Sequence, residues 1–232
     1  MRIVRRLFRE DCLLCSDAAG RISNLCDACH ADLPLLGHSC PICSRSMPVR
    51  TLCNDCSARM PAFQSTLAPY QYAGAVKYLI GRAKFDSNLA AALSLGELLA
   101  GWLKSNLLSR PDVLIPVPLH PSRLRHRGYN QATEVAKVVS KQLGIAVRGN
   151  FCERVRDTQP QSEMVDGRAR RRNVRGAFSC RNSAGELGSV ALVDDVMTTG
   201  ATLRELAVQL VKAGVSDIQV WVVSRTVSFY NQ

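Results

Sequence analysis

The sequence predicts an α/β fold, in which a mostly parallel sheet is flanked by helices and preceded by a small cysteine-rich region. Two observations predict it. From residue 111 onward, apolar runs typical of buried strands alternate with amphipathic helical patterns, the order that produces a parallel sheet. Before residue 61, eight of the ten cysteines occur as four Cys-x-x-Cys pairs. We therefore expect a cysteine-rich region at 1–61, a connecting segment and helix at 62–110, and an α/β domain at 111–232.

Four strands and two helices are expected in the α/β domain. Near-continuous apolar runs predict strands that are covered on both faces. Apolar residues spaced three and four apart predict helices with one buried face, and a glycine marks the end of each. The strands are expected at 112–118, 145–155, 189–196 and 218–226, and the helices at 130–144 and 202–214.

The other segments are less regular. We expect residues 63–88 to connect the cysteine-rich region to a helix at 89–108, which Arg110 and Pro111 end. The stretch 156–178 has no apolar periodicity and is rich in arginine, so it is expected to be a long loop with room for a short helical turn. Loops of that length inside a compact domain usually serve a function.

The eight paired cysteines have the spacing of zinc ligands. Each Cys-x-x-Cys turn directs two thiolates at one tetrahedral ion, so four pairs predict two closed, structural zinc sites. We expect sequential pairing, with an interleaved arrangement as the alternative. His30 and His38 lie among the pairs but are not needed as ligands, and the distant Cys152 and Cys180 are expected to be small core residues. The predicted ligands are Cys12, Cys15, Cys26 and Cys29 for one ion, and Cys40, Cys43, Cys53 and Cys56 for the other.

The chain carries a net charge of +11. This charge fits either an ordinary solvated basic surface or a polyanionic partner, such as a nucleic acid, a phosphorylated metabolite or a membrane surface. No apolar stretch reaches the roughly 20 residues that a membrane span needs. The basic segment at the start of the sequence lacks the apolar core of a secretory signal. We therefore expect a cytoplasmic protein with no membrane span.

The stretch "VALVDDVMTTGAT" (190–202) has the strongest chemical signal. Its apolar run predicts a buried strand, and ligands of open α/β sheets bind at the carboxyl ends of strands. Free N–H groups at the start of the next helix, with nearby hydroxyls, can hold a phosphate. Asp194 and Asp195 would repel a phosphate, so they suit sugar hydroxyls or Mg²⁺ beside it. The alternative is an ordinary helix cap with incidental acids.

This stretch resembles the phosphoribosyl pyrophosphate (PRPP) binding motif of type I phosphoribosyltransferases. The resemblance implies that 111–232 is a phosphoribosyltransferase domain. It also implies that Asp194 and Asp195 hold the ribose hydroxyls of Mg-bound PRPP. The 5′-phosphate would be held by the turn residues Thr198, Thr199, Gly200, Ala201 and Thr202.

The remaining motifs resemble the ComF family, which joins a zinc-ribbon segment to such a domain. The resemblance is carried by the Cys-x-x-Cys pairs, "LIPVPLHPSRLRHRGYNQATEVAK" and "RVRDTQPQSEMVDGRARRRNVRGAF". It covers essentially the whole chain. The family is named for competence, the uptake of DNA in natural transformation.

Two arginine-rich loops complete the site that this resemblance implies. The first follows the strand at 112–118 and would hold the pyrophosphate, through backbone amides and two guanidinium groups. Its residues are Leu119, His120, Ser122, Arg123 and Arg127. The second would close over the substrate and exclude water, with Gln159, Gln161, Arg168 and Arg172 as its candidate residues. Asn130 is expected to cap the following helix. For the arginines, a solvated basic loop is the alternative.

Two functions therefore remain open. The first is an enzyme that transfers a phosphoribosyl group from PRPP, with Mg²⁺, to an unknown acceptor. The second is a DNA-handling protein that binds single-stranded DNA and contacts proteins of the competence machinery, with PRPP as a regulator or a vestigial ligand. The second would use the basic charge and stacking aromatics such as Tyr129 or Phe178.

Overall fold

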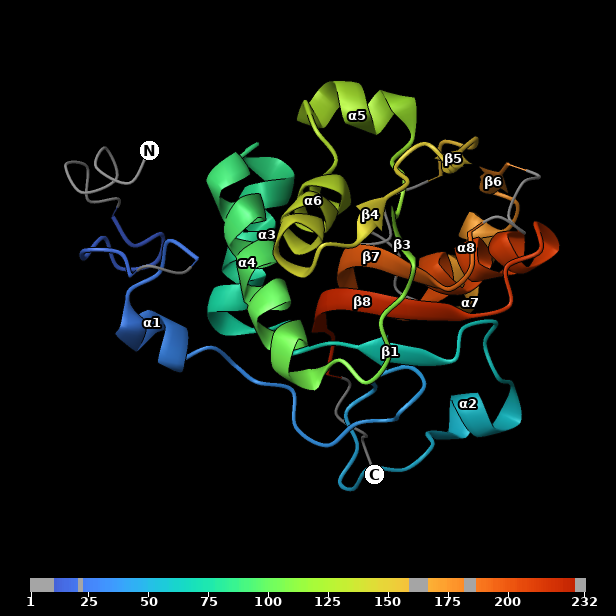
Figure 1. Cartoon of the computed structure of the whole chain (residues 1–232), viewed down its shortest axis with the longest axis horizontal. Helices are drawn as coiled ribbons and strands as arrows, with labels where there is room; N and C mark the ends of the chain where they lie inside the picture. The colour runs from blue at the N-terminus through green and yellow to red at the C-terminus, as the bar shows by residue number, and fades with distance from the viewer. Residues whose placement is uncertain (1–10, 21–22, 159–166, 182–186, 228–232) are drawn as a thin grey trace.

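The computed structural model describes residues 11–20, 23–158, 167–181 and 187–227 (Figure 1). Its centre is a six-stranded sheet in which every strand pair is parallel. β2 lies beside β8, next to the end of β1. In order across the sheet, the strands are β1 (Ser65–Leu67), β8 (Ile218–Arg225), β7 (Val190–Met197), β3 (Val113–Pro116) and β4 (Ala146–Val147), with β2 (Tyr70–Gln71) off this path.

The sheet is covered on both faces because its strands are apolar at successive positions. On β7, Val190 and Leu192 face one hydrophobic cluster, whereas Ala191 and Val193 face the other. This alternation follows from the two-residue period of a strand. Helices on both faces are the arrangement that parallel sheets require.

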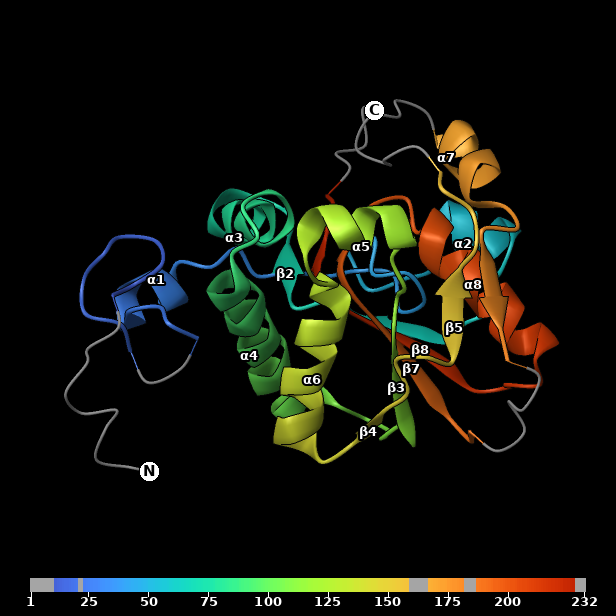
Figure 2. The same cartoon turned by 90° about the horizontal axis from the view of Figure 1, so that it is seen from above.

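Three helices cover one face of the sheet and lie together in Figure 2. They are α3 (Gly74–Phe85), α4 (Leu89–Asn106) and α6 (Gln131–Leu143). The opposite face carries α8 (Ala201–Lys212), and near it lie α7 (Gly167–Val174) and an antiparallel pair formed by β5 (Cys152–Arg154) and β6 (Phe178–Cys180). The three short helices are α1 (Asp27–Ala31), α2 (Asn54–Ala58) and α5 (Pro121–Arg127). Among the helices of the described ranges, none is long and apolar enough to cross a membrane.

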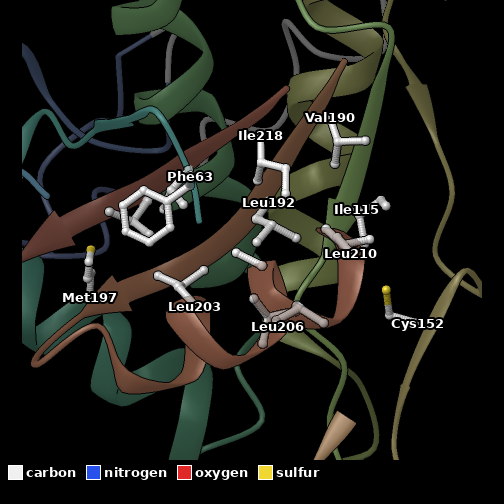
Figure 3. Close-up of a cluster of buried hydrophobic side chains, with 14 of the residues drawn as sticks. Phe63, Ile115, Cys152, Val190, Leu192, Met197, Leu203, Leu206, Leu210 and Ile218 are labelled. Atoms are coloured by element: carbon white, nitrogen blue, oxygen red, sulfur yellow. The ribbon is translucent and has the colours of Figure 1, made fainter. Parts of the chain in front are cut away.

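The core below the site is formed by α8 and the centre of the sheet. Figure 3 shows Leu203, Leu206 and Leu210 of α8 directed toward Val190 and Leu192 of β7. All five side chains are at most 1% exposed. This packing fixes the start of α8 against the end of β7, so the turn between them has a defined position.

Most predicted elements of the α/β domain are confirmed, with one correction. The strand expected at 145–155 is two strands in different sheets, because residues 148–151 turn the chain between β4 and β5. Gly144 ends α6 with a φ of 69°, as expected. Cys152 is buried in the α8 core, and Cys180 packs against the same cluster. The two cysteines are partners across the β5–β6 pair.

The segment at 63–88 contains more structure than a connection. It contributes β1 and β2 to the main sheet and then forms α3. Val76, Leu79, Ile80 and Ala83 form the buried side of this helix, with the spacing of an amphipathic helix. The long loop expected at 156–178 likewise contains the eight-residue helix α7, which is more than a short turn.

Candidate functional site

Two adjacent carboxylates lie at the carboxyl end of β7, the central strand of the sheet. Asp195 is 2% exposed, while Asp194 is half-buried. Burial and the neighbouring carboxylate of Asp195 together raise the pKa of Asp194 from 3.8 to about 7, against an opposing effect of Lys84. Two enclosed carboxylates of this kind favour a bound cation or hydroxyl donors in front of them.

The turn after β7 has the backbone geometry expected of an anion site. Gly200 precedes α8 with a φ of 76°, and an added Cβ would lie 2.4 Å from the methyl carbon of Met197. A glycine is therefore required at this position. Gly200, the N-cap of α8, has no side chain to cap the helix, and the N–H of Ala201 donates to the hydroxyl of Thr199 at 3.4 Å. The N–H groups at the start of a helix have no partner within the helix, so those that follow Ala201 suit a ligand. Thr198, Thr199 and Thr202 are half-buried around this turn, whereas Ala201 is buried.

The first basic loop is largely the short helix α5. Its N-cap is His120, whose Nδ1 accepts a hydrogen bond from the backbone N–H of Ser122. The hydroxyl of Ser122 donates to Asp157 at 2.6 Å, which lowers the pKa of that carboxyl group. Leu119, just before the cap, is half-buried. The loop is therefore tied to the chain that follows β5.

One arginine of α5, Arg127, interacts with the carboxylates, and a second, Arg123, lies near it. Burial lowers the pKa of Arg127, and the charges of Asp195 and Asp194 oppose that effect. Arg123 lies near Arg127 and donates a hydrogen bond to the carbonyl of Thr158. The structure thus brings Arg127 and both predicted aspartates into one electrostatic cluster, and Arg123 joins it through Arg127. Asn130 caps α6, as expected, by accepting from the N–H of Ala132 at 3.1 Å.

Lys84 belongs to this cluster but was not predicted from the sequence. It lies near the end of α3, and its Nζ is 2.8 Å from Oδ1 of Asp195. The side chain of Asp195 is 3% exposed and that of Lys84 is 20% exposed. The pairing arises because the end of α3 lies near the end of β7 in the fold, and nothing local in the sequence around Lys84 indicates it.

Arg154 is the second unpredicted residue. It is 6% exposed, its guanidinium lies 5.4 Å from the ring centroid of Phe178, and it donates to the hydroxyl of Thr158. Burial lowers its pKa to about 10, with a further contribution from Arg123, while Asp194 acts in the opposite direction. Its Nε is buried without a hydrogen-bond partner. A buried cation with an unused donor beside a carboxylate is suited to an anionic ligand.

The second basic loop is described only in part. Gln159 and Gln161 lie outside the described residues. Arg168 lies in α7, where the structure does not describe its side chain, and Arg172 is exposed on the same helix. The predicted closing of this loop over the site is therefore untested.

The cysteines form two groups of four in the sequential arrangement. In each group the sulfur atoms lie within 4.8 Å of one another, and neither group includes His30 or His38. One group is Cys12, Cys15, Cys26 and Cys29, called here the first zinc site, and the other is Cys40, Cys43, Cys53 and Cys56, called the second zinc site.

The geometry of both groups fits zinc. Sulfurs of Cys15 and Cys26 are 3.6 Å apart and those of Cys43 and Cys53 are 3.5 Å apart. A tetrahedral ion with Zn–S bonds of about 2.3 Å gives sulfur separations of about 3.8 Å. Burial, together with the other cysteines of the group, raises the pKa of Cys56. A divalent cation would offset that effect by stabilising the thiolates.

Comparisons with known proteins place this arrangement in a family. Residues 3–57 match the model of the double zinc ribbon domain. Competence protein F of Haemophilus influenzae is 33% identical over 213 residues, which cover 88% of this chain and 91% of that protein. The chain belongs to the ComF family.

Other members of the ComF family show the same extended similarity. DNA utilization protein YhgH of Salmonella typhimurium is 32% identical over 220 residues, covering 93% of this chain and 90% of that protein. Competence protein ComFC of Bacillus subtilis is 26% identical over 198 residues, covering 82% and 79%.

Two solved structures of named phosphoribosyl enzymes are also similar. One is glutamine phosphoribosylpyrophosphate amidotransferase from B. subtilis, with a TM-score of 0.37 and 21% identity over 56% of this chain and 25% of that one. The other is purine phosphoribosyltransferase from Pyrococcus horikoshii, with a TM-score of 0.32 and 18% identity over 69% and 87%. Both TM-scores are low, and the fold of this ComF family member follows from its own sheet and helices.

Proposed function

We propose that this chain binds PRPP with Mg²⁺ at the carboxyl end of β7 and transfers the phosphoribosyl group to an acceptor. One observation carries the proposal. The carboxylates of Asp194 and Asp195 lie directly before the glycine-led start of α8, and Arg127 of α5 interacts electrostatically with both of them. A ligand that satisfies all three needs hydroxyls, a terminal phosphate and a second anionic group.

Each part of the site has a separate binding role in this proposal. Asp194 and Asp195 accept hydrogen bonds from the ribose hydroxyls. The backbone N–H groups and threonine hydroxyls at residues 198–202 donate to the 5′-phosphate. Arg123 and Arg127 hold the pyrophosphate at the other end of the sugar.

The same residues can stabilise the charge that develops during transfer. In this proposal, Arg123, Arg127 and Arg154, which interact electrostatically with one another or with Asp194, stabilise the negative charge on the departing pyrophosphate. Fixed cations in an enclosed site favour such a state. The carboxylate oxygens are ligands of the kind that Mg²⁺ prefers. When bound, Mg²⁺ would neutralise charge on the pyrophosphate.

The test is calorimetric titration of PRPP and Mg²⁺ into zinc-loaded protein. We expect saturable binding by the wild type and its loss in an Asp194→Asn/Asp195→Asn variant. Asp217→Asn is the matched control, because Asp217 is exposed at the opposite end of the sheet, just before β8. Absence of binding by the wild type would refute the proposal. If the wild type binds PRPP, release of pyrophosphate on addition of candidate acceptors would establish the transfer step.

A second function, binding of single-stranded DNA, is supported by a surface beside this site. Tyr78 and Phe85 of α3 are 47% and 71% exposed, and each has an arginine near its ring, Arg82 at 5.7 Å and Arg127 at 5.8 Å. Exposed aromatics with arginines are typical of single-strand binding surfaces. The names of the relatives, which refer to competence and DNA utilization, agree with it.

The aromatics first considered for stacking do not fit this role. Phe178 is buried under Arg154, and the hydroxyl of Tyr129 donates to the carbonyl of Ala83 at 2.7 Å. Tyr78 and Phe85 replace them as candidates. An open pocket of about 580 Å³ next to Arg127 extends the same surface.

A further inference from the structure

Arg225, the last residue of β8, joins the second zinc site to the turn after β7. It is 3% exposed. Its Nε donates to the carbonyl of Cys43 at 3.0 Å, and its Nη1 donates to the carbonyl of Met197 at 2.9 Å and to that of Thr198. One guanidinium therefore holds the first Cys-x-x-Cys turn of this zinc site and the start of the candidate phosphate turn at the same time.

A second arginine makes a similar connection from the other side of the turn. Arg204 lies in the first turn of α8, and its Nη2 is 3.5 Å from the sulfur of Cys56. Its Nη1 donates to the carbonyl of Arg59 at 3.4 Å, and its guanidinium lies 5.9 Å from the ring centroid of Phe63. The second Cys-x-x-Cys turn of the same zinc site is thus tied to the start of α8.

These contacts are costly to make unless the zinc site is intact. Burial lowers the pKa of Arg225, so the folded protein encloses a guanidinium that depends on its carbonyl partners. The position of the Cys43 carbonyl is set by the fold of the ribbon around its four cysteines, which are at most 2% exposed. A ribbon of this kind derives its folding free energy from the metal. Loss of zinc would release one acceptor of Arg225 and loosen its hold on the other two.

Within the part of the chain that the structure describes, no hydrogen bond joins the first zinc site to the turn. Its Cys12 belongs to the hydrophobic cluster of α3 and α4, on the opposite face of the sheet from α8. Next to this site, the backbone N–H of Ser23 donates to Glu97 of α4 at 2.5 Å. The described residues therefore form two four-cysteine sites of the same chemistry, and the second zinc site is the one that contacts Arg225 and Arg204 beside the turn.

We propose that the second zinc site is a structural support of the 198–202 turn, and that Arg225 and Arg204 are the positioning residues that connect them. The first zinc site stabilises the α3–α4 face and leaves the turn unchanged. The effect on ligand affinity rests on the proposed binding of PRPP. The effect on the turn itself does not.

The test compares the two zinc sites by hydrogen exchange of the peptide that spans 198–202, measured without any ligand. Zinc content is measured on the same samples. A Cys40→Ser/Cys43→Ser variant is expected to lose one zinc and to exchange at the turn between about fivefold and a hundredfold faster. The matched Cys12→Ser/Cys15→Ser variant is expected to lose one zinc and to exchange at the turn like the wild type. Equal acceleration in both variants, or none in either, would overturn the proposal.

If a cysteine variant does not fold, substitutions of Arg225 and Arg204 still test whether the second zinc site supports the turn. Arg225→Met and Arg204→Met are expected to retain two zinc ions and still exchange faster at the turn. Arg225→Lys is expected to recover part of the protection, since an ammonium can donate to these carbonyls but cannot span all of them at once. Wild-type exchange at the turn in Arg225→Met would refute the connection.

Titration of PRPP with Mg²⁺ into the same proteins separates the two proposals. If the wild type binds PRPP, Arg225→Met is expected to bind it about tenfold more weakly. Unchanged affinity would overturn the ligand part of the inference. If the wild type does not bind PRPP, the proposed function fails, while the exchange results still decide whether the second zinc site supports the turn.

Discussion

Lys84 compensates the charge of Asp195 at a position where water has little access. The ion pair joins α3 to the end of β7, and its carboxylate is 3% exposed. Removing one partner of such a pair leaves a buried charge without compensation, which costs more than the pair itself contributes.

Lys84→Met is therefore expected to lower the free energy of unfolding by about 3 kcal/mol. Urea unfolding measures it. Lys77→Met is the matched control, because Lys77 is exposed on the same helix and is expected to change stability by less than about 0.5 kcal/mol. The double variant Lys84→Met/Asp195→Asn should recover part of the loss. If Lys84→Met is as stable as the control, the ion pair has no structural role.

The raised pKa of Asp194 predicts a pH dependence of ligand binding. Its carboxyl group holds a proton up to about pH 7 in the folded protein, whereas the ordinary value is 3.8. The ionised form accepts hydrogen bonds from ribose hydroxyls, so it becomes available as the pH rises through 7. The affinity for PRPP is expected to fall by roughly tenfold per unit as the pH drops below 7.

Titrations of PRPP at pH 6, 7 and 8 test this dependence, and Asp194→Asn separates it from titration of the ligand itself. Because the pKa of Asp194 is raised in the folded protein, its carboxyl group contributes most to the free energy of unfolding at low pH. This contribution is lost as the pH rises from about 4 to about 7. An equal pH dependence in wild type and variant would assign the effect to the ligand.

At the level of elements, the junction of β7 and α8 depends on one left-handed residue. Gly200→Ala would place a Cβ 2.4 Å from Met197 at a φ of 76°. We expect a loss of about 1–2 kcal/mol in stability, together with weaker PRPP binding. Gly101→Ala is the control, since Gly101 lies within α4 with open space around it. There, alanine is expected to stabilise by up to about 1 kcal/mol. Thermal unfolding of both variants would show opposite shifts.

The elements that the sequence predicted are those whose signal is local. β7 and β8 are nearly continuous apolar runs, and α6 and α8 have regular apolar stripes that end at a glycine or just before one. α3 was missed because its weak stripe lies within an aromatic-rich stretch that resembles a loop. The strand expected at 145–155 was too long because a turn inside it is marked by little more than Gly149 and Asn150.

The candidate site was likewise predictable only where its residues are close together in the sequence. Asp194, Asp195 and the turn lie within one short motif, so their proximity follows from the chain itself. Lys84 and Arg154 belong to α3 and β5, and only the tertiary fold brings them to Asp195 and Asp194. The connection from Arg225 to Cys43 spans 182 positions of the chain and has no local signal.

For the molecule as a whole, the proposed binding of single-stranded DNA is expected to depend on salt, because the chain carries a net charge of +11. Contacts with three to five phosphates would give a slope of log affinity against log salt of about −2 to −3.5. Tyr78→Ala/Phe85→Ala is expected to weaken binding with the slope unchanged, because these side chains would stack rather than pair with phosphate. Fluorescence anisotropy with an oligonucleotide at several salt concentrations measures both quantities. A slope near zero would exclude this mode of binding.

The position of β8 between β1 and β7 has a consequence for how the chain is made. The N–H of Ile218 donates to the side chain of Gln64 at 2.7 Å, across 154 positions. A ribosome adding about 5 to 20 residues per second needs roughly 8 to 30 s to cover that interval. During this time the edge of β1 that will pair with β8 has no partner strand. The second zinc site also lacks its contact with Arg225 until that residue has been synthesised. Factors that shield this edge during translation would determine how much of the protein escapes aggregation.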